Sequence, residues 1–164
     1  MVQVRVLGVA LDASMQHIVL LKPILDESVG DRVLPIWIGA EEATSIAIAI
    51  AGESAPRPLT HDLMVTVLEQ VGAELQRVEV TKIDDGTFYA ELTIGGSAGG
   101  RVLDARPSDS IALAVRVNAP IWVADDVLEE AGIPAELVAF GGDDAQLEEF
   151  KRFLDDVDPE DFEG

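Results

Sequence analysis

The sequence contains no cysteine and only two histidines, His17 and His61. The absence of cysteine excludes disulfides, zinc–thiolate sites, iron–sulfur clusters and thiol nucleophiles. Two histidines cannot build a three-histidine zinc site within one chain. Any metal site would therefore consist mainly of carboxylates, which favour a hard cation such as Mg²⁺ or Mn²⁺.

Long apolar runs are also missing. The stretch 46–51 is among the longest, far below the roughly 18 residues that a membrane-spanning helix requires. The first residues lack the basic segment and long apolar stretch that are typical of a secretory signal. Together with the absence of cysteine, these features predict a cytoplasmic location and no membrane partner.

Basic residues are few: 11 Lys and Arg stand against 31 Asp and Glu, giving a net charge of −20. Residues 1–123 carry nine basic and 16 acidic side chains, whereas residues 124–164 carry two and 15. Such a charge opposes nonspecific binding of nucleic acid. The acidic C-terminal end suits a basic protein partner.

Hydrophobic residues make up 48% of the 164-residue chain, a share that is large enough for the core of one domain. Alternating hydrophobic residues and turn signals predict one three-strand meander before residue 39 and a second between residues 75 and 103. Helical periodicity and end signals predict helices over 60–71, from 107 or 108 to 117, and over 127–131, with Thr60 as an N-cap. Residues 121–123 read as a short strand.

Residues 41–51 allow two interpretations. Isoleucine at every second position is typical of a strand, but the alanines between them, the two glutamates at the start and Gly52 at the end favour a buried helix. Residues 39–51 also align with residues 104–116 at an offset of 65. If this weak repeat is real, it predicts two meander–helix halves packed around two apolar helices.

These patterns together predict an α+β fold, in which two three-strand meanders form a twisted mixed sheet around central apolar helices. We expect the main domain to cover residues 1–135. Residues 136–164 should form an acidic helix and tail, because hydrophobic residues recur there at helical spacing.

The first polar cluster lies at residues 56–62. Arg57 could bind a phosphate through two hydrogen bonds, His61 could transfer a proton near neutral pH, and Asp62 could bind a metal. The structural alternative is that Thr60 and Asp62 cap a helix and that Arg57 pairs with a carboxylate.

The second cluster lies at residues 104–109. Asp104 and Asp109 flank a predicted strand-to-helix corner and could share one Mg²⁺, with Arg106 stabilising phosphate charge. The same residues could instead form an ion network that only fixes the corner. Glu42 occupies the corresponding corner of the first half. It could complement the helix dipole, pair with Arg57 or Arg106, or serve as a further metal ligand.

Several motifs, in the same order, resemble the bifunctional nuclease domain family. They are LPIWIG at 34–39, EA at 42–43, PRPLTHDL at 56–63, FYA at 88–90, DARPSDSIALA at 104–114, API at 119–121 and the short segments 153–154 and 158–162. The resemblance implies a sheet wrapped around central helices and a tendency to dimerise. It also implies the combined DNase and RNase activity for which plant members are named.

The resemblance favours a metal-assisted nuclease. In this hypothesis His61, Asp62, Asp104 and Asp109 are catalytic. Asp104, Asp109 and Glu42 hold Mg²⁺ or Mn²⁺, while Arg57 and Arg106 bind the substrate phosphate.

The alternative is a non-catalytic, dimeric binding or regulatory module. Its Arg and Asp clusters would be structural, and its acidic tail would dock a basic partner. The apolar content and the strand edges of two meanders make a homodimer the expected assembly under either hypothesis.

Overall fold

Eight strands form one mixed sheet in the order β6-β5-β4-β7-β1-β2-β3-β8. The computed structural model describes residues 1–24, 30–97 and 99–138. Their elements are β1 (Val2–Leu11), β2 (His17–Pro23), β3 (Arg32–Trp37), α1 (Ala40–Ile50), α2 (Thr60–Gln70), β4 (Ala73–Asp84), β5 (Thr87–Gly96), β6 (Arg101–Ala105), α3 (Pro107–Val117), β7 (Ile121–Val123), α4 (Asp125–Ala131), β8 (Ile133–Pro134) and the 3₁₀ helix η1 (Ala135–Val138).

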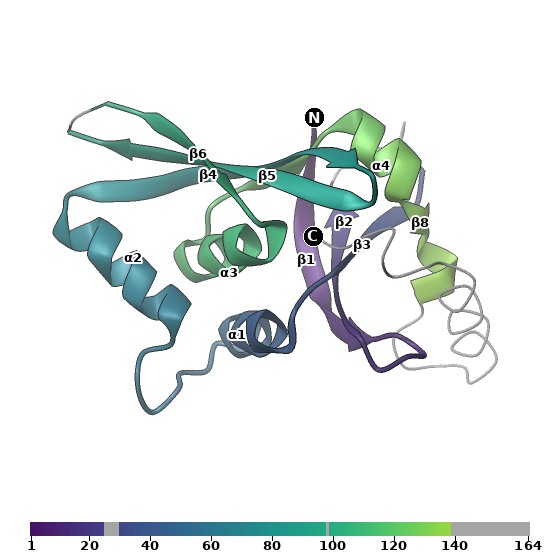
Figure 1. Ribbon diagram of the computed structural model, residues 1–164, viewed down its shortest axis with the longest axis horizontal. Coiled ribbons are helices and arrows are strands. Elements are labelled where there is room, and N and C mark those ends of the chain that lie inside the picture. The colour runs from purple at the N-terminus through teal and green to yellow at the C-terminus, as the bar shows by residue number, and fades with distance from the viewer. Residues whose placement is uncertain (25–29, 98, 139–164) are drawn as a thin grey trace.

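The sheet is mixed because β7 runs parallel to β4, whereas the other paired strands run antiparallel. Figure 1 shows the sheet turning around α1 and α3, with β4–β6 above the two helices and β1–β3 beside them. The predicted α+β fold, with a mixed sheet around central helices, is confirmed. Of the predicted acidic helix and tail at 136–164, residues 136–138 belong to the 3₁₀ helix η1, and residues 139–164 lie outside the described residues.

The two halves of the chain repeat one arrangement. A three-strand antiparallel meander precedes α1, and a second meander precedes α3. In the sheet, the two meanders lie on opposite sides of β7, and α1 contacts α3. This is the arrangement that the weak sequence repeat predicts.

The end signals place the helices to within two residues. Residues 41–50 are helical, and Gly52 follows α1 with φ +68°. At the start of α3, Pro107 occupies the first turn, and Asn118 ends the helix in the left-handed conformation. The prediction of Thr60 as an N-cap is wrong, because the N-cap of α2 is Leu59 and Thr60 is already helical.

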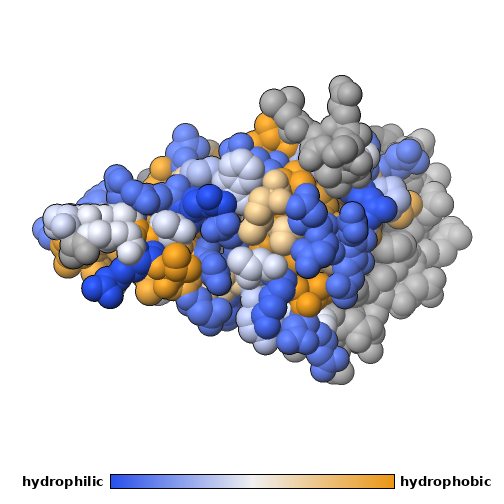
Figure 2. All heavy atoms as spheres, turned by 90° about the horizontal axis from the view of Figure 1, so that it is seen from above, coloured by the Kyte–Doolittle hydropathy of each residue, from blue (hydrophilic) through white to orange (hydrophobic). Residues whose placement is uncertain are grey.

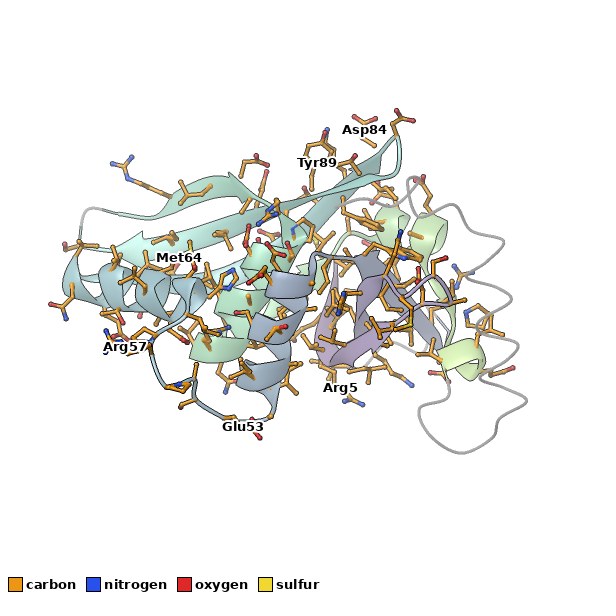
Figure 3. The ribbon with its side chains drawn as sticks, turned by 60° about the horizontal axis from the view of Figure 1, so that its bottom comes forward. Arg5, Glu53, Arg57, Met64, Asp84 and Tyr89 are labelled. Atoms are coloured by element: carbon orange, nitrogen blue, oxygen red, sulfur yellow. The ribbon has the colours of Figure 1, made fainter. Side chains whose placement is uncertain are left out.

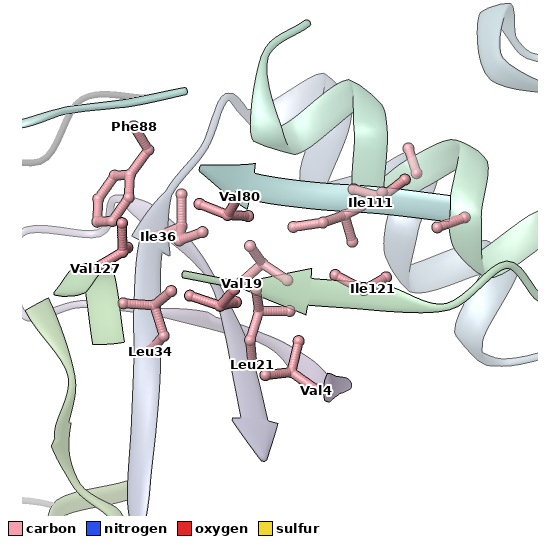
Figure 4. Packing of buried hydrophobic residues seen from close by; sticks show 14 of the residues in the cluster. Val4, Val19, Leu21, Leu34, Ile36, Val80, Phe88, Ile111, Ile121 and Val127 are labelled. Atoms are coloured by element: carbon pink, nitrogen blue, oxygen red, sulfur yellow. The ribbon is translucent and has the colours of Figure 1, made fainter. Parts of the chain in front are cut away.

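The main core lies between the concave side of the sheet and the helices α1 and α3 (Figure 4). Ile46 of α1 and Ile111 of α3 are fully buried there against strand residues such as Val78. A second, smaller cluster packs β8 and η1 onto β2 and β3. Burial of this kind fixes where the first turns of α1 and α3 lie.

The surface differs from face to face. Figure 2, seen from the sheet side, shows hydrophilic side chains over most of the visible described surface, with small separate hydrophobic areas. By contrast, α2 and its C-cap residue expose an apolar stripe, defined here as Leu63, Met64, Val67 and Val71. Figure 3 labels Met64 on this helix. None of the described helices has both the length and the hydrophobicity that crossing a membrane requires.

Candidate functional site

Three helices begin around one pocket. Its volume is about 500 Å³, and its lining comes from the first turns of α1 and α2 and from residues at the start of α3. The polar side chains in this lining include Glu42, Ser45, His61, Arg106 and Asp109. Backbone N–H groups at helix N-termini favour bound anions, so the position itself suits a phosphate.

His61 lies at the centre of the cluster and is 6% exposed. Its Nε2 is 2.9 Å from Oδ1 of Asp109 on α3. Its Nδ1 is 2.7 Å from Oγ of Ser45 on α1. One imidazole therefore joins all three helices.

Arg106 extends the cluster toward solvent. Its Nε donates to Oδ2 of Asp109 at 2.8 Å, and its Nη2 donates to Oε1 of Glu42 at 2.9 Å. The arginine side chain is 57% exposed, so an incoming anion can reach it. The pairing of Glu42 with Arg106, one of the predicted alternatives, is confirmed.

These contacts bias the charges of Asp109 and Arg106. Burial opposes ionisation of Asp109, but the hydrogen bonds from Arg106 and His61 outweigh it and hold the pKa of Asp109 below its ordinary value. The hydrogen bond to Asp109 in turn raises the pKa of Arg106. Asp109 is therefore an anion at neutral pH, and Arg106 is a cation.

Behind His61 lies Arg116 of α3, whose side chain is only 8% exposed. Its Nη2 donates to Oγ of Ser45 at 2.9 Å, and its Nε donates to Oδ1 of Asp62 at 2.8 Å. The other oxygen of Asp62 accepts the backbone N–H of Leu59 at 2.8 Å, which confirms that Asp62 caps α2. The hydrogen bond from Arg116, followed by that from Leu59, lowers the pKa of Asp62.

Four of the predicted site residues, Glu42, His61, Arg106 and Asp109, meet at the pocket. Asp62 faces a second pocket of about 430 Å³ on the other side of Arg116. The structure does not bring the remaining two predicted residues into the cluster.

Asp104 is exposed on β6, where it pairs in register with Glu91. Five residues later, the first turn of α3 directs Asp109 into the pocket, so the strand-to-helix corner separates the two carboxylates instead of joining them. Arg57 is exposed on the connection between α1 and α2 (Figure 3).

The structure does not bring together the ligands of the predicted metal site. Within the described ranges, no group of three or more His, Asp or Glu side chains is arranged to hold an ion. Glu42 and Asp109 both bind Arg106, whose positive charge stands where an ion would need to be. The side chains as placed do not fit Mg²⁺ or Mn²⁺, and metal dependence stays a prediction.

Two members of the cluster, Ser45 and Arg116, were not among the predicted site residues. Each has a signal in the sequence: Ser45 interrupts an Ile- and Ala-rich helix, and Arg116 stands between two valines near the end of another. A polar residue on an otherwise apolar helix is buried only when it has a partner. The identity of that partner depends on how the helices pack.

A model of the bifunctional nuclease domain matches residues 23–136, a range that includes every residue of the cluster. An uncharacterized protein of Mycobacterium tuberculosis is 42% identical over 99% of this chain and 98% of its own length. Bifunctional nuclease 1 of Oryza sativa is 28% identical over 68% of this chain but only 34% of the rice protein. Bifunctional nuclease 1 of Arabidopsis thaliana is 29% identical over 56% of this chain and 29% of its own length.

Proposed function

Because the chain belongs to the bifunctional nuclease domain family, we propose that it hydrolyses phosphodiester bonds in DNA, RNA or both. The plant relatives that carry the nuclease name are distant and much longer than the matched region. The proposal therefore depends on whether the cluster at the pocket suits this chemistry.

One observation supports it above the others: the hydrogen-bonded pair of His61 and Asp109 lies in a 500 Å³ pocket beside the exposed guanidinium of Arg106. A histidine held by a carboxylate is the usual means of moving a proton near neutral pH. A guanidinium next to it supplies two parallel donors for a phosphate.

In the proposed reaction, Arg106 and the N-terminal N–H groups of the helices bind the scissile phosphate. The phosphate takes the place of Glu42 as the second partner of Arg106, which is possible because the arginine is largely exposed. Asp109 keeps the ring of His61 in one orientation, and His61 accepts the proton of the attacking oxygen as that oxygen bonds to phosphorus.

The net charge of −20 restricts how the substrate binds. Repulsion makes a long run of phosphate contacts unfavourable, so affinity has to come from a few contacts at the pocket. We therefore expect weak binding of intact duplexes and a preference for single-stranded or short substrates, whose charge density is lower.

The test is cleavage of end-labelled single-stranded DNA and RNA by purified protein. An Asp109→Asn variant purified in parallel controls for contaminating nucleases. The proposal predicts cleavage by the wild type and a large loss in the variant. Equal cleavage by both preparations, or none by the wild type, would overturn it.

A second candidate function is a non-catalytic, dimeric binding or regulatory module. The exposed apolar stripe on α2 favours it, since a surface of this kind usually marks a contact with another protein. In this case the cluster would hold three helices together. This function predicts that the Arg106→Ala variant melts at a clearly lower temperature than the wild type. It also predicts that neither protein has nuclease activity.

A further inference from the structure

We propose that the hydroxyl of Ser45 is the nucleophile of the site and that it forms a transient covalent bond to the substrate phosphorus. The inference rests on the proposed phosphodiester hydrolysis and deepens it. The hydrogen bonds among Ser45, His61, Asp109 and Arg116 indicate which atoms carry the protons.

Arg116 has donors and no acceptor, so Oγ of Ser45 must accept from it at 2.9 Å. When the ring of His61 is neutral and its proton is on Nε2, Nδ1 accepts the one hydroxyl proton of Ser45, 2.7 Å away. On the other side of the ring, ionised Asp109 can only accept, so Nε2 carries the ring proton. The chain runs Ser45 O–H to His61, and His61 N–H to Asp109.

Neither ring nitrogen of His61 is left to take a proton from a free water molecule. The only proton that this base can remove is the one on Ser45. Ser45, His61 and Asp109 all belong to the lining of the same pocket, although Ser45 is only 4% and His61 only 6% exposed, so the serine lies at the wall of the space where a phosphate would bind. Base, orienting carboxylate and hydroxyl form the arrangement that activates a serine for attack.

Arg116 places a positive charge next to the hydroxyl oxygen of Ser45. Its guanidinium contacts Oγ directly and is itself anchored by Asp62 at 2.8 Å. A fixed positive charge beside the oxygen stabilises the negative charge that develops there when the proton leaves.

In the first step, Oγ of Ser45 bonds to phosphorus, its proton passes to Nδ1 of His61, and the bond from phosphorus to one sugar oxygen breaks. That oxygen takes a proton from solvent water. In the second step, water attacks phosphorus and releases a proton to solvent, and the bond from phosphorus to Oγ breaks. Oγ recovers its proton from His61. The products are one alcohol end and one phosphomonoester end.

The first experiment uses a fluorophosphonate probe and intact-mass measurement. We expect one probe adduct, located on Ser45 by peptide mapping, that is absent in Ser45→Ala and formed at least 100-fold more slowly in His61→Ala. Ser110→Ala is the matched control, because Ser110 is the repeat counterpart of Ser45, is equally buried, and donates only to the carbonyl of Arg106. It should label like the wild type.

The second experiment tests the inference even if Ser45→Ala does not fold. The chain has no cysteine, so Ser45→Cys introduces a single thiol. At pH 7 we expect iodoacetamide to alkylate it at least tenfold faster than the thiol of Ser110→Cys, with a pH profile shifted to lower pH that reverts in the His61→Ala background. A thiol at position 45 that reacts no faster than the one at position 110 would overturn the inference.

The outcomes separate this inference from the proposed function. If Ser45→Ala cleaves nucleic acid at nearly the wild-type rate while Asp109→Asn does not, the nuclease stands and the serine nucleophile is wrong. If the wild type labels on Ser45 but cleaves no nucleic acid, the nuclease proposal fails and the nucleophile stands. Acid-quenched single turnovers that leave labelled oligonucleotide bound to Ser45 would support both.

Discussion

The imidazole of His61 and the carboxylate of Asp109 are 2.9 Å apart, although 48 positions separate them in the chain. One belongs to α2 and the other to α3, and their contact closes one wall of the pocket. Two of the predictions below, on ring orientation and on acid stability, depend on this pair.

The first prediction concerns orientation of the ring. Asp109→Asn keeps the size of the side chain but removes its charge, so the ring loses its fixed tautomer and the imidazolium loses its counter-ion. We expect kcat on a single-stranded oligonucleotide to fall by about 10²- to 10⁴-fold, with little change in far-UV circular dichroism.

Asp84→Asn, at an exposed hairpin position of β4, is the matched control (Figure 3) and should retain full activity. Asp104→Asn tests one of the two assignments made from sequence that the structure leaves outside the cluster. A loss of activity as large as that of Asp109→Asn would show that Asp104 also takes part in catalysis.

The second prediction concerns phosphate binding. Arg106→Lys keeps the charge but loses the two-pronged geometry, and Arg106→Ala loses both. We expect KM to rise about tenfold in the first variant and further in the second. Steady-state kinetics on short oligonucleotides measure this, with exposed Arg101→Ala on β6 as the control. An unchanged KM in Arg106→Ala would remove Arg106 from substrate binding.

The third prediction concerns acid stability. The folded pKa of Asp109 is lowered, so its ion pairs stabilise the protein above the unfolded aspartate pKa of about 3.9 and lose their effect as pH falls through the lower folded value. The free energy of unfolding of the wild type should therefore exceed that of Asp109→Asn by a constant amount above about pH 5. The difference should shrink below about pH 4.

Urea unfolding of both proteins at a series of pH values measures this difference. A gap that stays constant down to pH 3 would show that the charge of Asp109 contributes nothing. A gap that widens on acidification would reverse the sign of the argument.

The fourth prediction concerns the metal. The expectation of Mg²⁺ or Mn²⁺ requires that EDTA abolish cleavage and that added Mn²⁺ restore it. Glu42→Gln should then weaken Mn²⁺ binding measured by calorimetry, while Glu53→Gln, on the exposed segment after α1, should not. Full activity in EDTA would match the direct contacts of Arg106 with Glu42 and Asp109, which leave an ion no pair of free carboxylates.

The fifth prediction concerns assembly. The apolar stripe on α2 carries no charge, and Val67 within it is 52% exposed. If it forms the contact of the expected homodimer, Val67→Asp should yield monomer in sedimentation equilibrium, whereas Thr66→Glu, on a neighbouring face of α2, should not. Because each chain carries −20, added salt should strengthen wild-type association. A monomeric wild type at high salt would contradict the homodimer.

The sequence predicted the elements well because their signals are local. Proline at the start of α3, Asn118 at its end and glycine after α1 act within one turn of the chain. The sequence did not predict which side of α2 is buried, because that depends on contacts with distant parts of the chain. Its Leu63 and Val67 repeat at helical spacing, yet both are exposed, because His61 and Val65 form the side that meets the body.

The sequence by itself determined the α+β class, the two meander–helix halves and the residue types that could bind phosphate or transfer a proton. Periodicity and end signals suffice for these, because they depend on neighbours a few positions apart. Only the tertiary structure decided which of the polar residues meet. It joined His61 to Asp109 and Ser45, set Arg116 behind them and left Asp104 outside, because a side chain finds its partner through the packing of helices that lie far apart in the chain.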